Sequence, residues 1–327
     1  MNWKGKTVLV TGAGGFIGSH LVEHLVALGA RTRAFFHYRG DGKWGLLEDS
    51  IVKKEIEGCS GDVRDFHTVV HAARGADVVF HLAALIAIPY SYHTPLSFAR
   101  TNVEGSLNVF QACRDTGVSL LIHTSTSEVY GTAQIIPIPE THALQGQSPY
   151  SATKIGADKL AEAFHLSFGL PVVTLRPFNT YGPRQSARAI IPTIVTQALS
   201  SDTVSLGSLS PTRDLNFVAD MVEAYIKAAE APGAIGQTIN IGSGQETSVG
   251  DLAKTILRLI GKNLPILADN QRIRPIASEV QRLCADNRKA KQMLGWSPRY
   301  TLEDGLPVVI QWISQHLHEY KVDSYAV

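Results

Sequence analysis

Tyr150 and Lys154 lie four residues apart in the run 148–154. In a helix this spacing places both side chains on one face, one turn apart. An ammonium group beside a phenol favours the phenolate, so the lysine should lower the pKa of the tyrosine toward neutral pH. The pair therefore predicts a general base that can take a proton from an alcohol. The alternative is an ordinary helix tyrosine that has a lysine on the same face.

The run 125–131, upstream of this pair, carries Thr126, Ser127 and Glu128. Glu128 offers a second base, and the two hydroxyl groups offer hydrogen bonds beside it. Two bases next to a hydride acceptor would allow more than the simple oxidation of an alcohol. The alternative is that Glu128 caps a helix or lies in a loop.

A glycine-rich turn at 11–18 predicts where a nicotinamide dinucleotide would bind. It follows a β-branched run at 7–10 and precedes a helical pattern at 16–28, which is the required strand–turn–helix context. The glycines permit a tight turn and the close approach of a pyrophosphate, which the helix N-terminus would face. We expect cofactor contacts from Gly12, Gly15, Phe16, Ile17 and Gly18. The alternative is a tight turn that binds nothing.

The end of the second predicted strand, 32–37, bears on the choice between NAD and NADP. No carboxylate stands there to hold the 2′-hydroxyl of the adenosine ribose. His37 and Arg39 could instead meet a 2′-phosphate, so the sequence favours NADP over NAD; the alternative is that both are solvated loop residues. Asp62 and Val63 follow a further predicted strand and are candidate adenine contacts, or else turn residues.

The predicted strand at 77–82 ends in small side chains. Leu82, Ala83 and Ala84 stand at and directly after its end, and we expect this strand to pass under the cofactor. Small residues there would let the backbone approach the nicotinamide or its ribose.

The elements that must position these residues alternate between strand and helix in the first half of the chain. Nearly continuous apolar strands between helices indicate a parallel sheet that is covered on both faces. Beyond about residue 178 the helices shorten, and Pro, Gly and Ser become frequent. We predict an α/β protein with a Rossmann-type, doubly wound parallel sheet in residues 1–178. A smaller C-terminal α/β substrate-binding lobe would occupy 179–327, with the chain crossing back to the first domain.

Bulk composition narrows the class of partner. The 327 residues contain 30 Lys and Arg against 29 Asp and Glu, with no basic tract, so we expect neither nucleic acid nor an anionic membrane as a partner. The three cysteines are far apart and have no metal-ligand spacing, so we predict no metal site. A strand pattern begins close to Met1, and reduced cysteines fit the cytoplasm. We therefore expect a cytoplasmic protein without a signal peptide.

Together with the run 176–183, the glycine-rich turn and the Tyr150–Lys154 pair resemble the extended short-chain dehydrogenase/reductase superfamily. Within it the chain is similar to the nucleotide-sugar epimerases, dehydratases and decarboxylases. The resemblance implies a nicotinamide cofactor, with Pro177 beside it, and a nucleotide-diphosphate sugar as the substrate. It also implies a homodimer built from a four-helix bundle of the helices at 102–116 and 150–168.

The Thr126-Ser127-Glu128 triplet narrows this resemblance. It resembles the triplets of GDP-mannose 4,6-dehydratases and of UDP-glucuronate decarboxylases, whereas plain 4-epimerases usually lack the glutamate. The runs 83–92, 144–150 and 182–188 are similar to the N-acetylglucosamine-nucleotide 4,6-dehydratases of legionaminic acid pathways. Other dehydratases carry Asp where this chain has Ser127, which leaves open the acid that protonates the leaving hydroxyl.

The resemblance implies a role for each candidate. Tyr150, helped by Lys154, would take the proton of the C4 hydroxyl, and Thr126 would bind the C4 oxygen. Glu128 would take the C5 proton, and Glu128 or a water on Ser127 would protonate the departing C6 hydroxyl. The expected substrate contacts are Asn179, Arg184, Arg213 and Arg274, since guanidinium groups suit a diphosphate. The alternatives are that Asn179 is a turn residue and that the arginines form surface ion pairs.

Two other functions remain open from the sequence. One is a decarboxylase or a 4-epimerase of a nucleotide-linked uronic acid, which would need a cation for the C6 carboxylate; Arg184 or Arg188 could supply it. The other is a non-catalytic, cofactor-binding regulator on the same fold, which would normally have lost Tyr150 or Lys154.

Overall fold

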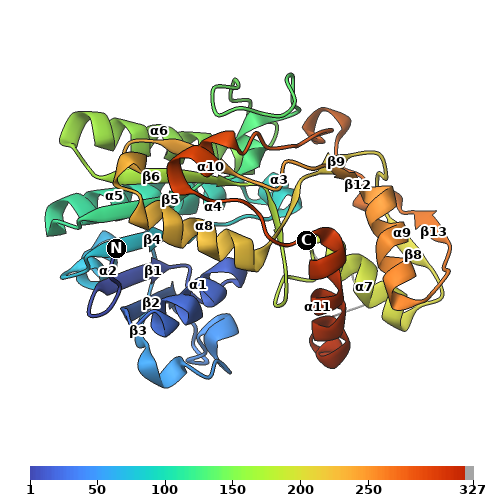
Figure 1. Ribbon diagram of the computed structural model, residues 1–327, viewed down its shortest axis with the longest axis horizontal. Coiled ribbons are helices and arrows are strands. Elements are labelled where there is room, and N and C mark those ends of the chain that lie inside the picture. The colour runs from blue at the N-terminus through green and yellow to red at the C-terminus, as the bar shows by residue number, and fades with distance from the viewer. Residues whose placement is uncertain (321–327) are drawn as a thin grey trace.

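The computed structural model describes residues 1–320, and its largest element is a sheet of seven strands (Figure 1). All neighbouring strands run parallel, in the order β11-β6-β5-β4-β1-β2-β3. The strands are β1 (Thr7–Thr11), β2 (Arg31–His37), β3 (Glu57–Gly61), β4 (Val78–His81), β5 (Leu120–Thr124), β6 (Val172–Pro177) and β11 (Thr238–Ile241). The predicted Rossmann-type sheet is thereby confirmed.

Helices cover both faces of this sheet, as the apolar strands require. Alternate residues of β1 point to opposite faces, so Val8 and Leu9 belong to different core clusters. The cluster with Val8 includes side chains of α1 (Phe16–Ala27), α8 (Val218–Glu230) and α10 (Arg288–Leu294). The cluster with Leu9 includes side chains of α2 (Phe66–Ala73), α5 (Gly105–Thr116) and α6 (Pro149–Phe168).

The strand order reverses direction at β1. The chain runs from β1 outward through β2 to β3, and then returns to place β4 on the other side of β1. Ligands of doubly wound sheets bind beyond the carboxyl ends of the strands at such a switch point. The glycine-rich turn after β1 and the residues after β4 both lie at this edge, so the topology predicts the ligand site there.

The long helix α6 carries the Tyr150–Lys154 pair, and its ends are fixed by local sequence. Ser148 and Ser151 form a reciprocal capping box, and Pro149 occupies the first turn. Gly169 ends the helix with a left-handed φ of 67°. Pro149 and Gly169 therefore mark the two ends of this helix.

Two other connections complete the large domain. Short helices α3 (Ile88–His93) and α4 (Pro95–Phe98) follow β4, and a π-helical turn over Ala99–Glu104 leads into α5. After β5, the 3-10 turn η4 (Ser127–Tyr130) begins the long connection to α6.

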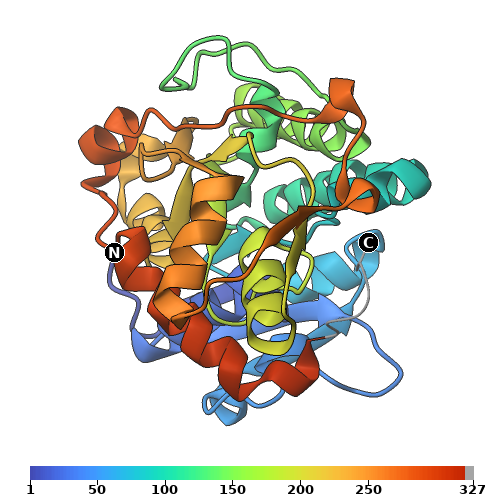
Figure 2. The same ribbon diagram turned by 90° about the vertical axis from the view of Figure 1, so that its right-hand side faces the viewer.

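The smaller lobe packs around its own core. Its helices are α7 (Ile190–Ser200), α9 (Val249–Ile260) and α11 (Leu302–Gln315), which together line one apolar cluster. Figure 2 shows α9 and α11 on the face of this lobe that turns toward the viewer. Three two-stranded sheets pair β7 (Asn179–Tyr181) with β10 (Leu215–Phe217), β8 (Val204–Leu206) with β13 (Ile266–Ala268), and β9 (Thr212–Arg213) with β12 (Thr247–Ser248).

The chain returns to the large domain twice after residue 178. The first return places α8 against α1 and β11 at the edge of the large sheet beside β6, and the second places α10 against α8 and β11. Strand β11 is the last strand in chain order to join this sheet. Its partner β6 lies much earlier in the chain, and a parallel pairing between such distant segments leaves no local signal.

Two properties of the described region concern partners. Among residues 1–320, no helix is long and apolar enough to span a bilayer. In the same part of the chain, no three His, Cys, Asp or Glu side chains are arranged to hold a metal ion.

Candidate active site

Tyr150 and Lys154 are both buried where α6 begins. The Nζ of Lys154 donates a hydrogen bond of 2.7 Å to the carbonyl oxygen of Thr124, at the end of β5. The ring of Tyr150 packs edge-on against Phe98 of α4, with centroids 6.3 Å apart. The helix and the neighbouring strand therefore hold the pair in a protein-lined, water-poor position.

Burial dominates the electrostatics of this pair. It raises the pKa of Tyr150 well above its ordinary value, and a hydrogen bond shared with Thr126 opposes that rise. Burial also lowers the pKa of Lys154 to about 8, while the charge of Asp158 opposes that fall. The expected lowering of the tyrosine pKa is therefore not present in the protein alone. The reason is that both groups are fully desolvated, which disfavours the charged form of each.

Thr126 and Glu128 lie next to Tyr150. The hydroxyl of Thr126 accepts a hydrogen bond of 3.2 Å from the backbone N–H of Glu128, and so caps the η4 turn. Ser127 is buried, whereas Glu128 is only half-buried. Within residues 1–320 the Glu128 carboxylate forms no hydrogen bond and no ion pair, although its charge is felt by Tyr150. Glu128 is thus a free carboxylate beside the phenol and not a helix cap.

The glycine-rich turn has the shape that a pyrophosphate needs. Gly12 has a φ of 71°, and a Cβ there would come within 2.7 Å of the backbone of Ala83. A Cβ on Gly18 would overlap the carbonyl oxygen of Gly12. Gly15 precedes α1, and no side chain caps that helix. The first turn, with Phe16 and Ile17, therefore presents its N–H groups to a ligand.

The turn after β1 also contacts the segment after β4. The backbone N–H of Ala83 donates to the hydroxyl of Thr11 at 3.2 Å, and that hydroxyl lies 2.8 Å from Nδ1 of His81. Leu82 and Ala83 therefore lie against the glycine-rich turn, and the expected approach of this segment, with Ala84, to the nicotinamide stays a prediction. A glycine at 12 is required because any side chain would separate the two segments.

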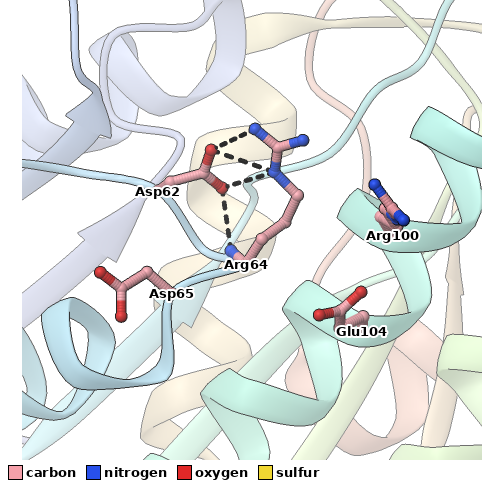
Figure 3. A pocket seen from close by; sticks show the side chains of 5 residues that line it. All are labelled: Asp62, Arg64, Asp65, Arg100 and Glu104. Carbon is pink, nitrogen blue, oxygen red and sulfur yellow. Dashed lines mark hydrogen bonds and ion pairs between the residues drawn. The ribbon is translucent and has the colours of Figure 1, made fainter.

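A hollow of about 450 Å³ lies beyond the end of β3 and is lined by Asp62, Arg64, Asp65, Arg100 and Glu104 (Figure 3). Asp62 is paired with Arg64 through hydrogen bonds of 2.5 to 3.0 Å. Its Oδ2 also lies 3.7 Å from Nδ1 of His37. A carboxylate does therefore stand beside the end of β2, supplied by β3, the adjacent strand.

The other cation considered for a 2′-phosphate is already paired. The guanidinium of Arg39 donates two hydrogen bonds to Asp41, of 3.2 and 3.1 Å, at the surface. Val63 lies deeper, and its carbonyl oxygen accepts a hydrogen bond of 3.0 Å from Asn108 on α5. Asp62, and not Arg39, is thus the charged group that the structure pairs with His37.

Two of the predicted substrate residues converge across the smaller lobe. Arg213 on β9 donates a hydrogen bond of 3.0 Å to the Glu279 carboxylate and another of 2.8 Å to the carbonyl oxygen of Val280. Arg274 lies 3.5 Å from the same Glu279 oxygen. Two guanidinium groups therefore face one carboxylate, so this site has a net positive charge. Nothing in the sequence identified Glu279 as their shared partner.

The remaining two predicted substrate residues have different surroundings. Asn179, at the start of β7, has a buried Oδ1 without a hydrogen-bond partner among the described residues. Arg184 has a φ of 69° and forms two hydrogen bonds, of 3.2 and 2.5 Å, with Glu23 on α1. Asn179 is therefore available to a ligand, whereas Arg184 joins the smaller lobe to the cofactor-side helix.

A strap at 274–280 connects the arginine pair to the catalytic side. The hydroxyl of Ser278 lies 2.6 Å from that of Tyr92 on α3, and it donates to the carbonyl oxygen of Gln147 at 2.6 Å. Tyr92 packs on the small cluster that contains Tyr150. These contacts bring the strap beside the start of α6, although more than a hundred residues separate the two segments. Such long-range contacts have no signature in a single sequence.

Comparison with known proteins agrees with this arrangement. The family model described as GDP-mannose 4,6 dehydratase matches residues 9–308. A dTDP-glucose 4,6-dehydratase of Xanthomonas campestris is 32% identical, with 94% of this chain and 92% of that protein aligned. A UDP-glucose 4-epimerase of Mycolicibacterium smegmatis is 31% identical, with 93% and 97% aligned. The chain spans about half the length of two trifunctional Arabidopsis thaliana relatives, which are 32% identical to it.

A solved structure shows the same fold with a cofactor. DesIV, the dTDP-glucose 4,6-dehydratase of Streptomyces venezuelae, was solved with NAD bound. It superposes with a TM-score of 0.87 at 29% identity, covering 96% of this chain and 99% of that one. The chain therefore belongs to the GDP-mannose 4,6-dehydratase family of nucleotide-sugar dehydratases and epimerases, within the extended short-chain dehydrogenase/reductase superfamily.

Proposed function

We propose that the protein is a nucleotide-sugar 4,6-dehydratase that converts a nucleoside-diphosphate N-acetylglucosamine into its 4-keto-6-deoxy derivative. The observation that carries this proposal is the unpaired Glu128 carboxylate beside the buried Tyr150–Lys154 pair. An epimerase needs only one base at C4, whereas elimination across C5 and C6 needs a second.

The residues present fit a nicotinamide cofactor. Gly12, Gly15 and Gly18 shape the turn for the pyrophosphate, and Ala83 supplies a close backbone contact. Pro177, the last residue of β6, would border the nicotinamide end. When bound, the oxidised cofactor supplies a hydride acceptor and a positive charge, and it is regenerated when the hydride returns to the sugar.

The chain's own groups would move the protons. Tyr150 takes the proton of the C4 hydroxyl, while Thr126 holds the C4 oxygen and Lys154 supports the phenolate. The C4 ketone acidifies the C5 proton, which Glu128 removes. Water leaves C6, with the proton supplied by Glu128 or by a water held on Ser127. Burial around Tyr150 excludes bulk water, which protects the ketone intermediate.

The substrate's diphosphate would lie at Arg213 and Arg274. Their guanidinium groups match phosphate oxygens in geometry, and Glu279 holds them in place before the substrate arrives. Asn179, with its unpaired side-chain oxygen, would donate its amide N–H groups or accept a hydroxyl from the ligand. The preference for N-acetylglucosamine rests on the resemblance to the dehydratases of legionaminic acid pathways.

Incubation with a panel of UDP-, GDP-, CDP- and dTDP-linked sugars, read by mass, tests the proposed reaction. A dehydratase product has lost one water, a decarboxylase product has lost carbon dioxide, and an epimerase product has an unchanged mass. We expect loss of water from an N-acetylglucosamine nucleotide. A 4-epimerase is the second candidate, because a relative of similar identity carries that activity. Loss of carbon dioxide, or no loss of mass with any sugar, would rule out the dehydratase.

The absence of an acid at the end of β2 favours NADP. Two contacts of the folded chain nevertheless support NAD, which we propose as the cofactor. Asp62 places a carboxylate 3.7 Å from His37, and Arg39 is held by Asp41. A 2′-phosphate beside His37 would therefore meet the Asp62 carboxylate, whereas a 2′-hydroxyl would find that carboxylate as an acceptor. We expect the cofactor released from purified protein to be NAD by mass, and Arg39→Ala to leave its affinity nearly unchanged. NADP in the released fraction, with weaker binding in Arg39→Ala, would contradict this.

A further inference from the structure

Beneath Lys154 lies a cluster of buried titratable side chains that the proposed proton transfers do not use. Each comes from a different element of the large domain. Burying such groups is costly unless they are paired, so their arrangement calls for a function or for full compensation. The members are His81 of β4, His123 of β5, Tyr130 of η4, Asp158 of α6 and Arg176 of β6.

Asp158 is the centre of this cluster. It lies one helical turn beyond Lys154 on α6 and is only 5% exposed. Its Oδ2 accepts a hydrogen bond of 3.0 Å from Nε of Arg176 and forms an ion pair of 3.0 Å with Nη2 of the same residue, and its Oδ1 lies 3.3 Å from Nε2 of His123. Although burial opposes ionisation, the contacts with His123 and Arg176 hold the pKa of Asp158 below its ordinary value. The carboxylate is therefore charged at neutral pH.

The other members are fixed around this carboxylate. Arg176 donates to the hydroxyl of Tyr130 at 2.9 Å, which donates in turn to Asn240 at 2.7 Å. Burial lowers the pKa of His81 and of His123, so both imidazoles are neutral at neutral pH. The charged groups of the cluster are then one carboxylate and one guanidinium, which cancel.

Lys154 is the additional cation: it lies one turn before Asp158 on α6, and the two side chains form no ion pair of 4.0 Å or less, so their charges interact over a longer distance. Its one hydrogen bond to a described residue goes to the Thr124 carbonyl, which binds an amine as well as an ammonium. The groups that face it from neighbouring elements are His81 and His123, both neutral, and Tyr150 on its own helix. Asp158 is therefore the anion that stabilises the ammonium form of Lys154 relative to the neutral amine.

We propose that Asp158 is a positioning residue that keeps Lys154 protonated, so that the ammonium can support the Tyr150 phenolate during proton removal. This rests on the proposed function only in the use of the Tyr150–Lys154 pair. Arg176 and His123 hold the carboxylate in the charged form and aim it, and they do not touch the substrate. The direction of the effect on the pKa of Lys154, which Asp158 raises against burial, agrees with this geometry.

The test measures the protonation of Lys154 directly. In protein labelled with ¹³C at lysine Cε, the Lys154 signal is assigned by its loss in Lys154→Met and followed against pH. We expect a midpoint near 8 in the wild type. Asp158→Asn should lower it by at least one pH unit, which is a tenfold change in the proton affinity. An unchanged midpoint in folded Asp158→Asn would overturn the proposal.

Three further variants separate charge from structure. Asp158→Glu keeps the charge, so its Lys154 midpoint should lie close to that of the wild type. Asp158→Asn combined with Arg176→Gln leaves no unpaired guanidinium, so it tests the same charge if the single variant fails to fold. Asp220→Asn is the matched control, because that buried carboxylate binds backbone N–H groups of Arg299 and Tyr300 on the α8 side. It should leave the Lys154 midpoint unchanged, and a shift there equal to that of Asp158→Asn would also contradict the proposal.

A second readout links this proposal to turnover. The alkaline limb of the pH–rate profile for the active nucleotide sugar should move to lower pH in Asp158→Asn by the same amount as the Lys154 midpoint. If no sugar of the panel reacts with the wild type, the proposed function fails, while the protonation measurement still decides the role of Asp158. A moved midpoint with an unmoved alkaline limb would show that Asp158 controls Lys154 but that catalysis does not depend on it.

Discussion

Lys154 is only 3% exposed, and burial lowers its pKa from an ordinary 10.5 to about 8. A base whose pKa falls on folding destabilises the native state wherever the unfolded state is protonated. The full penalty, about 3 kcal/mol, applies below pH 8 and disappears as the pH rises from about 8 to 10.5. The site therefore holds its cation at a cost in stability, which a protein without this function would avoid.

Replacing this lysine should make that cost measurable. Lys154→Met removes the buried charge and keeps most of the side-chain volume, but it leaves the Thr124 carbonyl without its partner. We expect the variant to be more stable than the wild type by roughly 1 to 2 kcal/mol at pH 7 and no more stable at pH 10. Denaturant unfolding at both pH values measures this difference. A difference that does not change with pH would show that Lys154 has the same pKa in the folded and unfolded states, as a solvated amine would.

At the scale of elements, the strap at 274–280 carries Glu279, which holds the two arginines proposed to bind the diphosphate. Arg213→Ala removes one guanidinium from the pair that Glu279 holds. We expect a 10- to 100-fold weaker binding of the free nucleoside diphosphate, because charge-assisted hydrogen bonds contribute about 1.5 to 3 kcal/mol each. Isothermal titration calorimetry with the nucleotide of the active sugar measures the loss.

Arg258→Ala is the matched control for this experiment. Arg258 on α9 pairs with Glu303 on α11, and both side chains are exposed. Its removal should leave nucleotide binding unchanged. Equal affinities for Arg213→Ala and the control would place the diphosphate elsewhere.

The same elements show what a single sequence can predict. Strand β1 and helix α1 lie where the β-branched run at 7–10 and the helical pattern at 16–28 place them, because these patterns are local properties of the chain. The glycine-rich turn and the Tyr150–Lys154 spacing were readable for the same reason. The pairing of Glu279 with two arginines and the approach of Asp62 to His37 were not, since these partners come from different elements of the fold. The protonation of the pair was also beyond the sequence, because it depends on how completely the fold excludes water.

At the scale of the whole molecule, α5 and α6 offer a surface for the expected homodimer. They pack side by side on one face of the large sheet (Figure 1). The exposed residues of α6 include Ala152, Lys159, Ala163 and Leu166, which follow the spacing of one helix stripe. Small side chains in such a stripe allow two helices to approach closely, so we propose this face as the centre of a four-helix bundle.

A large charge in this stripe should separate the subunits. We expect the wild type to have twice the 35.4 kDa chain mass by light scattering, and Ala163→Arg to shift it toward the single-chain mass. Val308→Arg is the control, because Val308 is also exposed but lies on α11 in the smaller lobe. A monomeric wild type, or a dimer that only Val308→Arg disrupts, would contradict the proposed interface.

We propose above all that Glu128 removes the C5 proton of a sugar whose C4 hydroxyl proton the Tyr150–Lys154 pair has taken. Turnover of the active nucleotide sugar in D₂O, followed by mass and by NMR at C5, tests it most directly. We predict a product that has lost one water and carries deuterium at C5. In Glu128→Gln this product should form about 100- to 10,000-fold more slowly, with nucleotide-sugar binding retained. A product of unchanged mass, or a Glu128→Gln variant that dehydrates its substrate at near the wild-type rate, would contradict the account.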